Sequence, residues 1–377
     1  MSLEGLTPEE RGRYARHLML PELGVEGQER LKQSAVLCVG AGGLGSSLLL
    51  YLAAAGVGRI GIVDGDLVEV SNLQRQVIHG TASLGGSKAR SAANRIADLN
   101  PLCQVEVHEH MLDSHNALDL IGSYDLVCDG SDNFPTRFLV NDACVLKGRP
   151  LIYGSVQRFD GQVSVFNRNP DSPNYRDLLP EPPPAGAVPS CSEAGVMGVM
   201  PGLIGLLQAT EAIKLITGIG DCLDGRLLVV DALRMRFREL TLRPDPSRPP
   251  IEQLIDYRQF CRPEAPSMDS ISVIDLKALL DSAAPDVVLL DVRNPPEADV
   301  ATIPGGKLIP LAQIESGEAI DQIRALAGDQ RLFVHCKLGG RSARAVELLA
   351  QQGIHATNVT GGIDAWSQQV DPSLPRY

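Results

Sequence analysis

A glycine-rich turn near the amino end has the residue spacing of a nucleotide-binding site. An apolar run at 36–39 predicts a strand, a helical pattern follows over 46–55, and Gly40, Gly42 and Gly45 stand between them. Glycine lets the backbone turn tightly and approach a phosphate, whose charge the amino end of a helix favours. Asp64 follows the next predicted strand, where an acid can accept ribose hydroxyls. Alone, this pattern fits a nicotinamide or flavin fold as well as another adenine-nucleotide site.

Three polar residues after this unit are not needed by a dehydrogenase. Asn72, Arg75 and Lys88 place one amide and two cations just past the strand that precedes Asp64. Such a set suits a triphosphate and the charge that develops on a transferred phosphoryl or nucleotidyl group. These residues therefore favour nucleotide transfer over hydride transfer.

Two aspartates follow another predicted strand. The apolar run at 124–128 leads into Asp129 and Asp132, and acids at the carboxyl end of a parallel strand lie at the ligand-binding edge of the sheet. Because Mg²⁺ prefers oxygen ligands, Asp132 is a candidate to hold it. The alternative interpretation is that both aspartates only form a turn.

Cys336 has the surroundings of a reactive thiol. The predicted strand 331–335 runs directly into it, and a glycine-bearing loop and a helical pattern follow. Loop N–H groups and the helix dipole stabilise an anionic sulfur, either a thiolate or a persulfide, and Lys337 and Arg341 add positive potential. The alternatives are a buried structural cysteine and a cysteine phosphatase. A phosphatase loop needs a longer spacing than the four residues between Cys336 and Arg341, and the smaller loop suits a sulfane sulfur better than a phosphate.

Cys191 is a second candidate thiol. It follows the proline-rich stretch 180–189, which predicts an extended linker. Close to a helix start, the helix dipole would stabilise its thiolate. From the residue alone, a small buried side chain at the base of the loop is an equally good interpretation.

The elements that must position these residues form two α/β regions. We predict a first domain over 1–243, a proline-containing linker over 244–268 and a second, smaller domain over 269–377. The chain of 377 residues is long enough for each domain to bury its own core.

Other segments of the first domain frame the site. A helical lead-in over 13–30 carries Arg16, and the apolar stretch 203–217 predicts a long helix used in the core or in a dimer contact. Two strands are predicted over 151–166, with Gly161 at the turn between them.

Composition excludes some classes of partner. No apolar run reaches membrane-spanning length and the polar amino end lacks the core of a signal peptide, so we expect a cytoplasmic protein that does not bind membranes. The net charge of -12 supplies no face for neutralising phosphates, which argues against a nucleic-acid partner. The eight cysteines show no disulfide spacing, so each is expected to be structural or reactive in a reducing compartment.

Several motifs in order over 13–243 resemble those of the ThiF and MoeB adenylyltransferases, relatives of the ubiquitin-activating enzymes. The motifs are RYARH, VGAGGLGSS, DGD, SNLQRQ, a lysine in GGSKA, and GSDN. The resemblance implies a Rossmann-like domain that uses ATP, with Arg75, Lys88 and Asp132 among its catalytic residues. It assigns the nucleotide to Gly40, Gly42, Gly43 and Gly45, the ribose to Asp64 and Asp66, the phosphates to Asn72, Arg75 and Lys88, Mg²⁺ to Asp132, and a contact across a homodimer to Arg16.

The reaction that this resemblance implies is adenylation of the C-terminal glycine of a small ubiquitin-like sulfur carrier that ends in Gly-Gly. The carboxylate attacks the α-phosphate and pyrophosphate leaves. The resulting acyl phosphate anhydride carries a leaving group that a sulfur nucleophile can displace.

One departure from the family concerns zinc. Many members carry two CxxC pairs that bind a structural zinc ion, and a complete double pair would be a strong signal. Here the first pair aligns with 174–177 and the second with 243–248, and neither segment contains cysteine. Cys261 is left alone, so we expect no zinc site.

Residues 269–377 resemble a rhodanese sulfurtransferase domain in LLDVRNPPEADVATIPG, HCKLGGRS and VTGGIDAW. The resemblance implies that Cys336 receives sulfur as a persulfide from a donor such as a cysteine desulfurase or thiosulfate. This persulfide would attack the adenylate, and Cys191 would resolve the acyl disulfide or form a thioester first.

The fusion of the two domains favours molybdopterin synthesis, with thiamin synthesis, transfer-RNA thiolation and cysteine synthesis as alternatives. A rhodanese with a nucleotide-binding front domain, a dinucleotide-dependent oxidoreductase and a scaffold protein are the other classes that the sequence leaves open.

Overall fold

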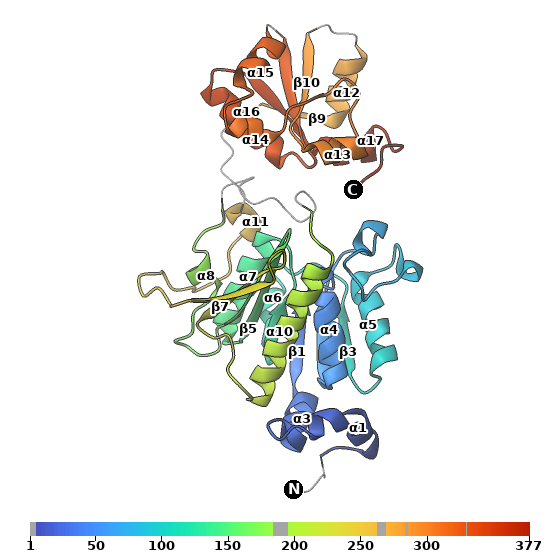
Figure 1. Ribbon diagram of the computed structural model, residues 1–377, viewed down its shortest axis with the longest axis vertical. Coiled ribbons are helices and arrows are strands. Elements are labelled where there is room, and N and C mark those ends of the chain that lie inside the picture. The colour runs from blue at the N-terminus through green and yellow to red at the C-terminus, as the bar shows by residue number, and fades with distance from the viewer. Residues whose placement is uncertain (1–4, 184–194, 262–268, 283–285, 329) are drawn as a thin grey trace. The chain divides into compact units, whose positions relative to one another are not determined.

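The chain forms two compact units, described below as the first and second domains. The computed structural model describes residues 5–183, 195–261, 269–282, 286–328 and 330–377. The first domain comprises the described residues up to Pro182 and those from 195 to Cys261, and the second domain contains those from 269 to Tyr377. Both domains are of the α/β class, as the sequence predicts (Figure 1).

A mixed sheet of eight strands forms the centre of the first domain, in the order β3-β2-β1-β4-β5-β6-β7-β8. The strands are β1 (Ala35–Val39), β2 (Arg59–Val63), β3 (Gln104–His108), β4 (Leu126–Asp129), β5 (Leu151–Gln157), β6 (Asp160–Phe166), β7 (Arg226–Asp231) and β8 (Arg236–Thr241). The first five pair in parallel and the last three continue antiparallel. The order reverses between β1 and β4, which is the place where an open α/β sheet binds its ligand.

Helices cover both faces of this sheet (Figure 1). The α-helices described in this domain are α1 (Pro8–Arg13), α2 (Ala15–Leu18), α3 (Gly24–Gln33), α4 (Gly43–Ala55), α5 (Lys88–Leu99), α6 (Ala117–Gly122), α7 (Phe134–Lys147), α8 (Tyr175–Leu178), α10 (Val199–Thr217) and α11 (Tyr257–Phe260). One apolar core joins α4, α5 and α10 to the sheet, and a second joins α6, α7 and α11 to its other face. The predicted helical lead-in over 13–30 is confirmed, and it contains the end of α1, all of α2 and most of α3.

The helix α10 is longer than predicted and lies in the core. It packs against α4 and the β5 and β6 strands, and Met200 and Ile204 are fully buried. By length and composition alone α10 could cross a membrane, so the sequence-based statement that no apolar run reaches this length is wrong. Its packing is that of a core helix, which was one of the two predicted uses.

The turn between β5 and β6 differs from the prediction. It lies at Arg158 and Phe159, where Arg158 has a φ of 54°, and Gly161 stands inside β6. A Cβ atom on Gly161 would come within 2.3 Å of Cδ1 of Ile204. Glycine at this position therefore leaves room for the Ile204 side chain of α10 and does not form the turn.

The second domain is built on five parallel strands in the order β11-β10-β12-β13-β9. The strands are β9 (Ser270–Ser272), β10 (Val287–Asp291), β11 (Lys307–Leu308), β12 (Arg331–His335) and β13 (Ala356–Thr360), and the helices are α12 (Val273–Asp281), α13 (Pro295–Val300), α14 (Leu311–Glu315), α15 (Ile320–Ala327), α16 (Gly340–Gln351) and α17 (Gly362–Gln369). One core packs α14, α15 and α16 against the sheet and a second packs α12 and α17. The predicted strand 331–335 is confirmed, and Cys336 follows it directly.

Candidate functional site

The first site is a cavity of about 790 Å³ at the carboxyl ends of β1, β2 and β4. Its volume lies in the usual range for small-molecule pockets. The glycine turn after β1 forms one wall, and Gly40, Gly42 and Gly43 line the cavity. Parallel strands bring these loops together because all of their carboxyl ends meet at one edge of the sheet.

Two glycines give the turn its shape. Gly40 has a φ of +91°, a conformation that side chains rarely adopt, and a Cβ there would lie 3.0 Å from the carbonyl oxygen of Gly130. A Cβ on Gly45 would lie 2.2 Å from the carbonyl oxygen of Gly40. Gly45 is buried inside α4 and does not line the cavity, so in this structure its place is to let the helix pack against the turn.

Asp64 connects the second strand to the glycine turn. One carboxylate oxygen accepts a hydrogen bond from the Ala41 N–H and the other from the Asp66 N–H, each at 2.8 Å. Burial raises the pKa of this carboxyl group, and the two N–H donors oppose that rise. Asp64 lines the cavity, where its remaining acceptor capacity can take hydroxyl donors.

Two cations line the same cavity. The ammonium group of Lys88 at the start of α5 is almost fully buried and pairs with the Asp66 carboxylate at 2.9 Å. Arg75 donates to the Ser71 carbonyl oxygen at 3.0 Å. An anionic ligand that enters here meets two positive charges, of which one is already held by Asp66.

Asp132 lies on the opposite side of the turn, after β4. It lines the cavity and is exposed, whereas Asp129 is buried and accepts from the Ser131 N–H at 2.8 Å. Burial raises the pKa of Asp129, and the charge of the neighbouring Arg137 opposes that rise. An exposed carboxylate in the same cavity as two cations fits a nucleoside triphosphate with Mg²⁺, because Mg²⁺ is usually held by one or two carboxylates and by substrate phosphates.

Besides Gly45, two further residues assigned by resemblance do not line the cavity. Asn72 is buried, and its side-chain oxygen accepts from the Glu69 N–H at 3.1 Å in the short 3₁₀ turn Val70–Asn72. Arg16 is exposed on α2, with Nη1 3.7 Å from the sulfur of Met19. The role of Arg16 across a dimer stays a prediction.

The cavity also has walls that the sequence did not reveal. Buried Gln76 and Arg137 line it, and Arg137 donates to the Ser131 carbonyl oxygen at 3.2 Å. Two further wall segments are 110–115, which follows β3, and 254–258, which lies within the predicted linker. The glutamine stands in the SNLQRQ motif and could have been noticed, but no local pattern marks the other residues.

The segments that align with the zinc-binding pairs of the family are joined by an ion pair. Asp177 accepts from Nε of Arg248 and from the Asp245 N–H, both at 3.0 Å, and its side chain is fully buried. Its other oxygen accepts from the Asn174 N–H at 2.8 Å. Among the described residues, no group of three or more His, Cys, Asp or Glu is placed to hold a metal ion.

We therefore expect Asp177→Ala to lower the stability of the first domain by about 2–3 kcal/mol, because it removes a fully buried carboxylate and leaves three donors, two of them partly buried, without their acceptor. Calorimetry of the full chain measures this, with Asp98→Ala as the control because Asp98 pairs only with exposed Arg95. A zinc chelator should leave the first-domain melting temperature unchanged. A fall on chelation would contradict the predicted absence of zinc.

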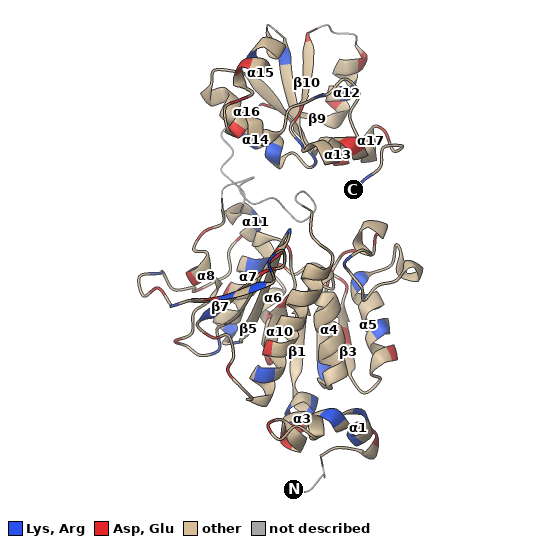
Figure 2. Cartoon of the chain, in the orientation of Figure 1, with Lys and Arg blue, Asp and Glu red and all other residues tan. Residues whose placement is uncertain are grey.

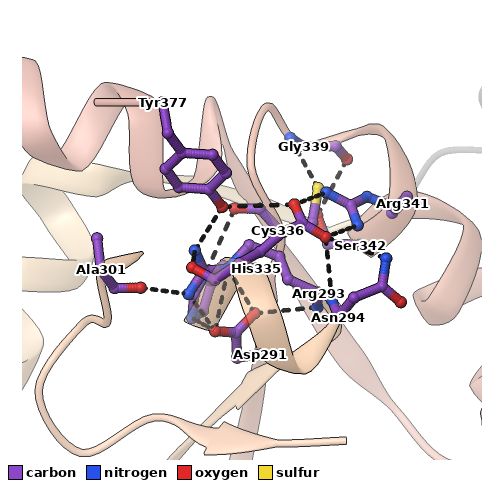
Figure 3. Close-up of polar contacts among 11 residues, drawn as sticks. Asp291, Arg293, Asn294, Ala301, His335, Cys336, Gly339, Arg341, Ser342 and Tyr377 are labelled. Carbon is purple, nitrogen blue, oxygen red and sulfur yellow. Dashed lines mark hydrogen bonds and ion pairs between the residues drawn. The ribbon is translucent and has the colours of Figure 1, made fainter. Parts of the chain in front are cut away.

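The second site surrounds the sulfur of Cys336 at the carboxyl end of β12 (Figure 3). The thiol is fully buried, and the Gly339 N–H donates to Sγ at 3.1 Å. The Ser342 hydroxyl lies 3.4 Å from Sγ and 2.7 Å from the side-chain oxygen of Asn358. With α16 beginning at Gly340, the sulfur lies at a helix amino end, so the predicted cup of donors is present.

A buried arginine holds the base of this site together. Arg293 is fully buried and pairs with Asp291, with Nη2 2.5 Å from Oδ2. It also donates to the carbonyl oxygen of Ala301 at 2.8 Å and to the hydroxyl of Tyr377 at 2.6 Å (Figure 3). Burial lowers the pKa of His335, which keeps this neighbour of the thiol neutral at pH 7.

The charge of Arg341 is compensated, which the sequence prediction did not include. Its two terminal nitrogens pair with the two carboxylate oxygens of Glu297 on α13, each at 2.7 Å. Lys337 is buried with its ammonium 4.5 Å from the ring centre of Tyr377. Arg341 therefore does not add the positive potential at the thiol that the sequence predicts, because the Glu297 carboxylate offsets its charge.

Glu297→Gln is expected to destabilise the second domain by about 2 kcal/mol at pH 7, because it breaks a partly buried bidentate pair. Burial alone would raise the pKa of Glu297, but hydrogen bonds from Arg341 and the Asn294 N–H bring it below the usual 4.5. A carboxyl group with a lowered folded-state pKa stabilises above its unfolded-state pKa and loses that contribution as the pH falls through its folded-state pKa.

The difference in the free energy of unfolding between Glu297→Gln and wild type should thus be full at pH 7 and shrink below about pH 4. Denaturation followed by the fluorescence of Trp366 measures this, because Trp366 is the only tryptophan of the chain and is buried in the second domain. Glu347→Gln, which removes a half-buried pair with Arg344 that is more exposed than the Arg341–Glu297 pair, is the control. An equal loss of stability in Glu297→Gln at pH 7 and at pH 3 would contradict a stabilising role of the ionised Glu297 carboxylate.

The other predicted thiol, Cys191, lies outside the described residues. All cysteines in the described part of the chain are free thiols. Residues of both charges are scattered over the elements of both domains (Figure 2).

Comparison with known proteins identifies both domains. Residues 14–250 match the ThiF family and residues 272–369 match the rhodanese-like domain. A Mycobacterium tuberculosis protein named probable adenylyltransferase/sulfurtransferase MoeZ is 51% identical over 99% of this chain and 96% of its own length. The Sus scrofa protein named adenylyltransferase and sulfurtransferase MOCS3 is 44% identical over 99% of this chain and 89% of its own length.

Solved structures agree with the fold of the first domain. The crystal structure of E. coli MccB with ATP has a TM-score of 0.54 and 20% identity, over 63% of this chain and 73% of that chain. At this identity the likeness shows the fold alone.

Proposed function

We propose that this chain, which belongs to the ThiF family and continues into a rhodanese-like domain, activates and sulfurates a ubiquitin-like sulfur carrier. The chain would adenylate the C-terminal glycine of the carrier with ATP and then deliver sulfur from Cys336. The observation that carries the proposal is the presence in one chain of two sites. One is a cavity lined by a glycine turn, Lys88, Arg75 and Asp132, and the other is the Cys336 thiol with the Gly339 N–H and the Ser342 hydroxyl beside its sulfur. The names of the relatives, adenylyltransferase and sulfurtransferase, support both halves.

The first step is attack of a carboxylate oxygen of the carrier on the α-phosphorus of ATP. A new oxygen–phosphorus bond forms, the bond to the oxygen that bridges to the β-phosphate breaks, and pyrophosphate leaves with the electron pair. The acyl-adenylate keeps the energy of the anhydride. Its acyl carbon is then open to attack by sulfur, since AMP is a good leaving group.

The residues of the cavity divide this work between them. The glycine turn and the amino end of α4 face the phosphates, and Asp64 orients the ribose. Lys88 and Arg75 stabilise the charge that grows on the departing pyrophosphate. Asp132 is the candidate ligand of Mg²⁺, which when bound would neutralise phosphate charge.

Sulfur reaches Cys336 before it reaches the carrier. With thiosulfate as donor, the Cys336 thiolate attacks the outer sulfur, a sulfur–sulfur bond forms and sulfite leaves. With the persulfide of a cysteine desulfurase, the same attack leaves a free thiol on the donor. The Gly339 N–H and the helix amino end would stabilise the terminal sulfur anion.

Transfer then proceeds through an acyl disulfide. The terminal sulfur attacks the acyl carbon and AMP leaves, which joins the carrier to Cys336 through two sulfurs. A second thiol, for which Cys191 is the candidate, attacks the sulfur of Cys336 and the carrier thiocarboxylate leaves. A disulfide between the two cysteines remains, and a cellular thiol must reduce it before the next cycle.

Further parts of the proposal concern setting. We also propose a homodimer, in which Arg16 reaches the partner's site, and a cytoplasmic location. The free thiols of the described residues support a reducing compartment. Molybdopterin synthesis is the preferred pathway because MOCS3 relatives span nearly the whole chain. Thiamin synthesis, transfer-RNA thiolation and cysteine synthesis are the alternatives.

ATP–pyrophosphate exchange tests the proposal. Purified protein and Mg²⁺ are assayed with a panel of Gly-Gly-ended carriers, each also supplied without its terminal glycine. Exchange that needs the intact tail supports adenylation and identifies the carrier. No exchange with any carrier, alongside normal sulfur transfer from thiosulfate to cyanide, would leave a sulfurtransferase as the only activity.

A further inference from the structure

We propose that residues 254–258 form a wall of the ATP cavity that docks when nucleotide binds and is released when nucleotide leaves. This segment lies near the end of the first domain, just before the connection to the second, so its docking or release would set the length of that connection. The inference rests on the proposed use of ATP and adds a regulatory contact to the same cavity.

The first observation is where the segment lies in the sequence and in space. The ThiF match ends at residue 250 and the rhodanese-like match begins at 272, so 254–258 belongs to neither. Leu254, Ile255 and Tyr257 nevertheless line the cavity together with the glycine turn and Asp64. Residues of the first domain that lie beyond its ThiF match thus complete its binding site.

The segment is anchored on its far side. The Tyr257 ring is buried, and its hydroxyl donates to the Asp142 carboxylate at 2.7 Å. Phe260 packs edge-on against Phe138 of α7, with ring centres 5.3 Å apart. Asp256 accepts hydrogen bonds from the N–H groups of Arg258 and Gln259 and so begins α11.

On the cavity side the anchoring is weaker. The Ser114 hydroxyl donates to the Ile255 carbonyl oxygen at 2.8 Å and joins the segment to wall 110–115. Ile255 itself is 36% exposed. An apolar surface that faces an open cavity is stabilised when a ligand covers it.

The base of the nucleotide is the part that would cover this surface. In the proposed function, the glycine turn, Lys88, Arg75 and Asp132 would hold the phosphates and Asp64 would hold the ribose, and all of them line this cavity. The walls 110–115 and 254–258 are then left for the purine ring. Stacking a flat ring on Leu254 and Ile255 suits the apolar character of this wall.

Docking of residues 254–258 must raise the affinity for nucleotide by the same factor by which bound nucleotide favours docking. With the segment docked, the second domain is tethered from Cys261. With it released, the tether begins near Arg248, which the Asp177 pair holds. A longer tether in the nucleotide-free state would widen the reach of the second domain for collecting sulfur.

Tyr257→Phe is the sharpest variant for testing this. It removes only the hydroxyl, and Asp142 keeps Arg176, whose Nε and Nη2 donate at 2.9 and 2.7 Å. Tyr124→Phe is the matched control, since that buried hydroxyl donates to Glu106, which likewise keeps its arginine, Arg59, and neither residue lines the cavity.

Full-length protein is studied by hydrogen–deuterium exchange with and without a non-hydrolysable ATP analogue and Mg²⁺, and the Kd of the analogue is measured by calorimetry. We expect nucleotide to slow exchange in 254–261, and Tyr257→Phe to raise the Kd about threefold to tenfold while Tyr124→Phe changes it by less than about twofold.

Analogue binding without slower exchange in 254–261, or equal Kd values for Tyr257→Phe and wild type, would overturn the inference and leave the proposed function standing. A failure of the analogue to bind at all would overturn both, and carrier-dependent exchange of pyrophosphate reports on the proposed function separately.

Discussion

Replacing Cys336 with serine is expected to abolish formation of the carrier thiocarboxylate while leaving carrier-dependent ATP–pyrophosphate exchange at the wild-type rate. A serine hydroxyl cannot form a persulfide, so no sulfur can be held in the cup made by Gly339 and Ser342. Volume and hydrogen-bonding capacity are nearly kept. The loss of sulfur transfer should be at least about a thousandfold, as for other nucleophiles removed from enzymes.

Cys103→Ser is the matched control for this substitution. Burial raises the pKa of the Cys103 thiol to about 12, so at neutral pH it is protonated and unreactive. It should retain both activities. Cys191→Ser should still acquire persulfide on Cys336 but release the thiocarboxylate slowly. Loss of adenylation itself in the Cys336 or Cys191 variant would contradict a purely sulfur-transfer role for that cysteine.

The second large effect is expected from Asp132→Asn, which should reduce pyrophosphate exchange by about a hundredfold to a thousandfold. The change removes the anionic charge that fits Mg²⁺ and keeps the shape of the side chain. Asp132 is exposed, and its carboxylate accepts a hydrogen bond from the Asn133 side chain at 3.5 Å, so the substitution should not disturb the fold.

Exchange measured against Mg²⁺ concentration distinguishes a metal role from a structural one. The variant should need more Mg²⁺ for half-maximal rate, whereas Asp119→Asn, an exposed acid outside the cavity, should behave as wild type. An unchanged Mg²⁺ requirement in Asp132→Asn would contradict its assignment as a metal ligand, even if the rate fell.

The sequence predicts those parts of the site that follow from strand order. Gly40, Asp64 and Asp132 each come just after a parallel strand, and a parallel sheet must bring such residues to one edge. The loop after β12 is predictable for the same reason. Local patterns are sufficient here because the geometry depends only on neighbouring elements.

What the sequence could not reveal depends on contacts between distant segments. The pairing of Arg341 with Glu297 joins residues from two different helices, and no spacing rule connects them. The wall at 254–258 lies in a proline-containing stretch that has the composition of a linker. The sequence predicts a turn at Gly161, whereas in the structure this residue lies within β6 against Ile204 of α10. Such a contact arises only in the folded chain, so no local pattern marks it.

The most direct test of the central claim is the mass of the carrier after reaction. Full-length protein is incubated with a Gly-Gly-ended carrier, Mg-ATP, thiosulfate and a thiol reductant, and the intact carrier is weighed by mass spectrometry. We predict a carrier in which one oxygen has been exchanged for one sulfur, only when ATP and Cys336 are both present. A carrier of unchanged mass across the panel, or one that gains sulfur without ATP, would contradict the account.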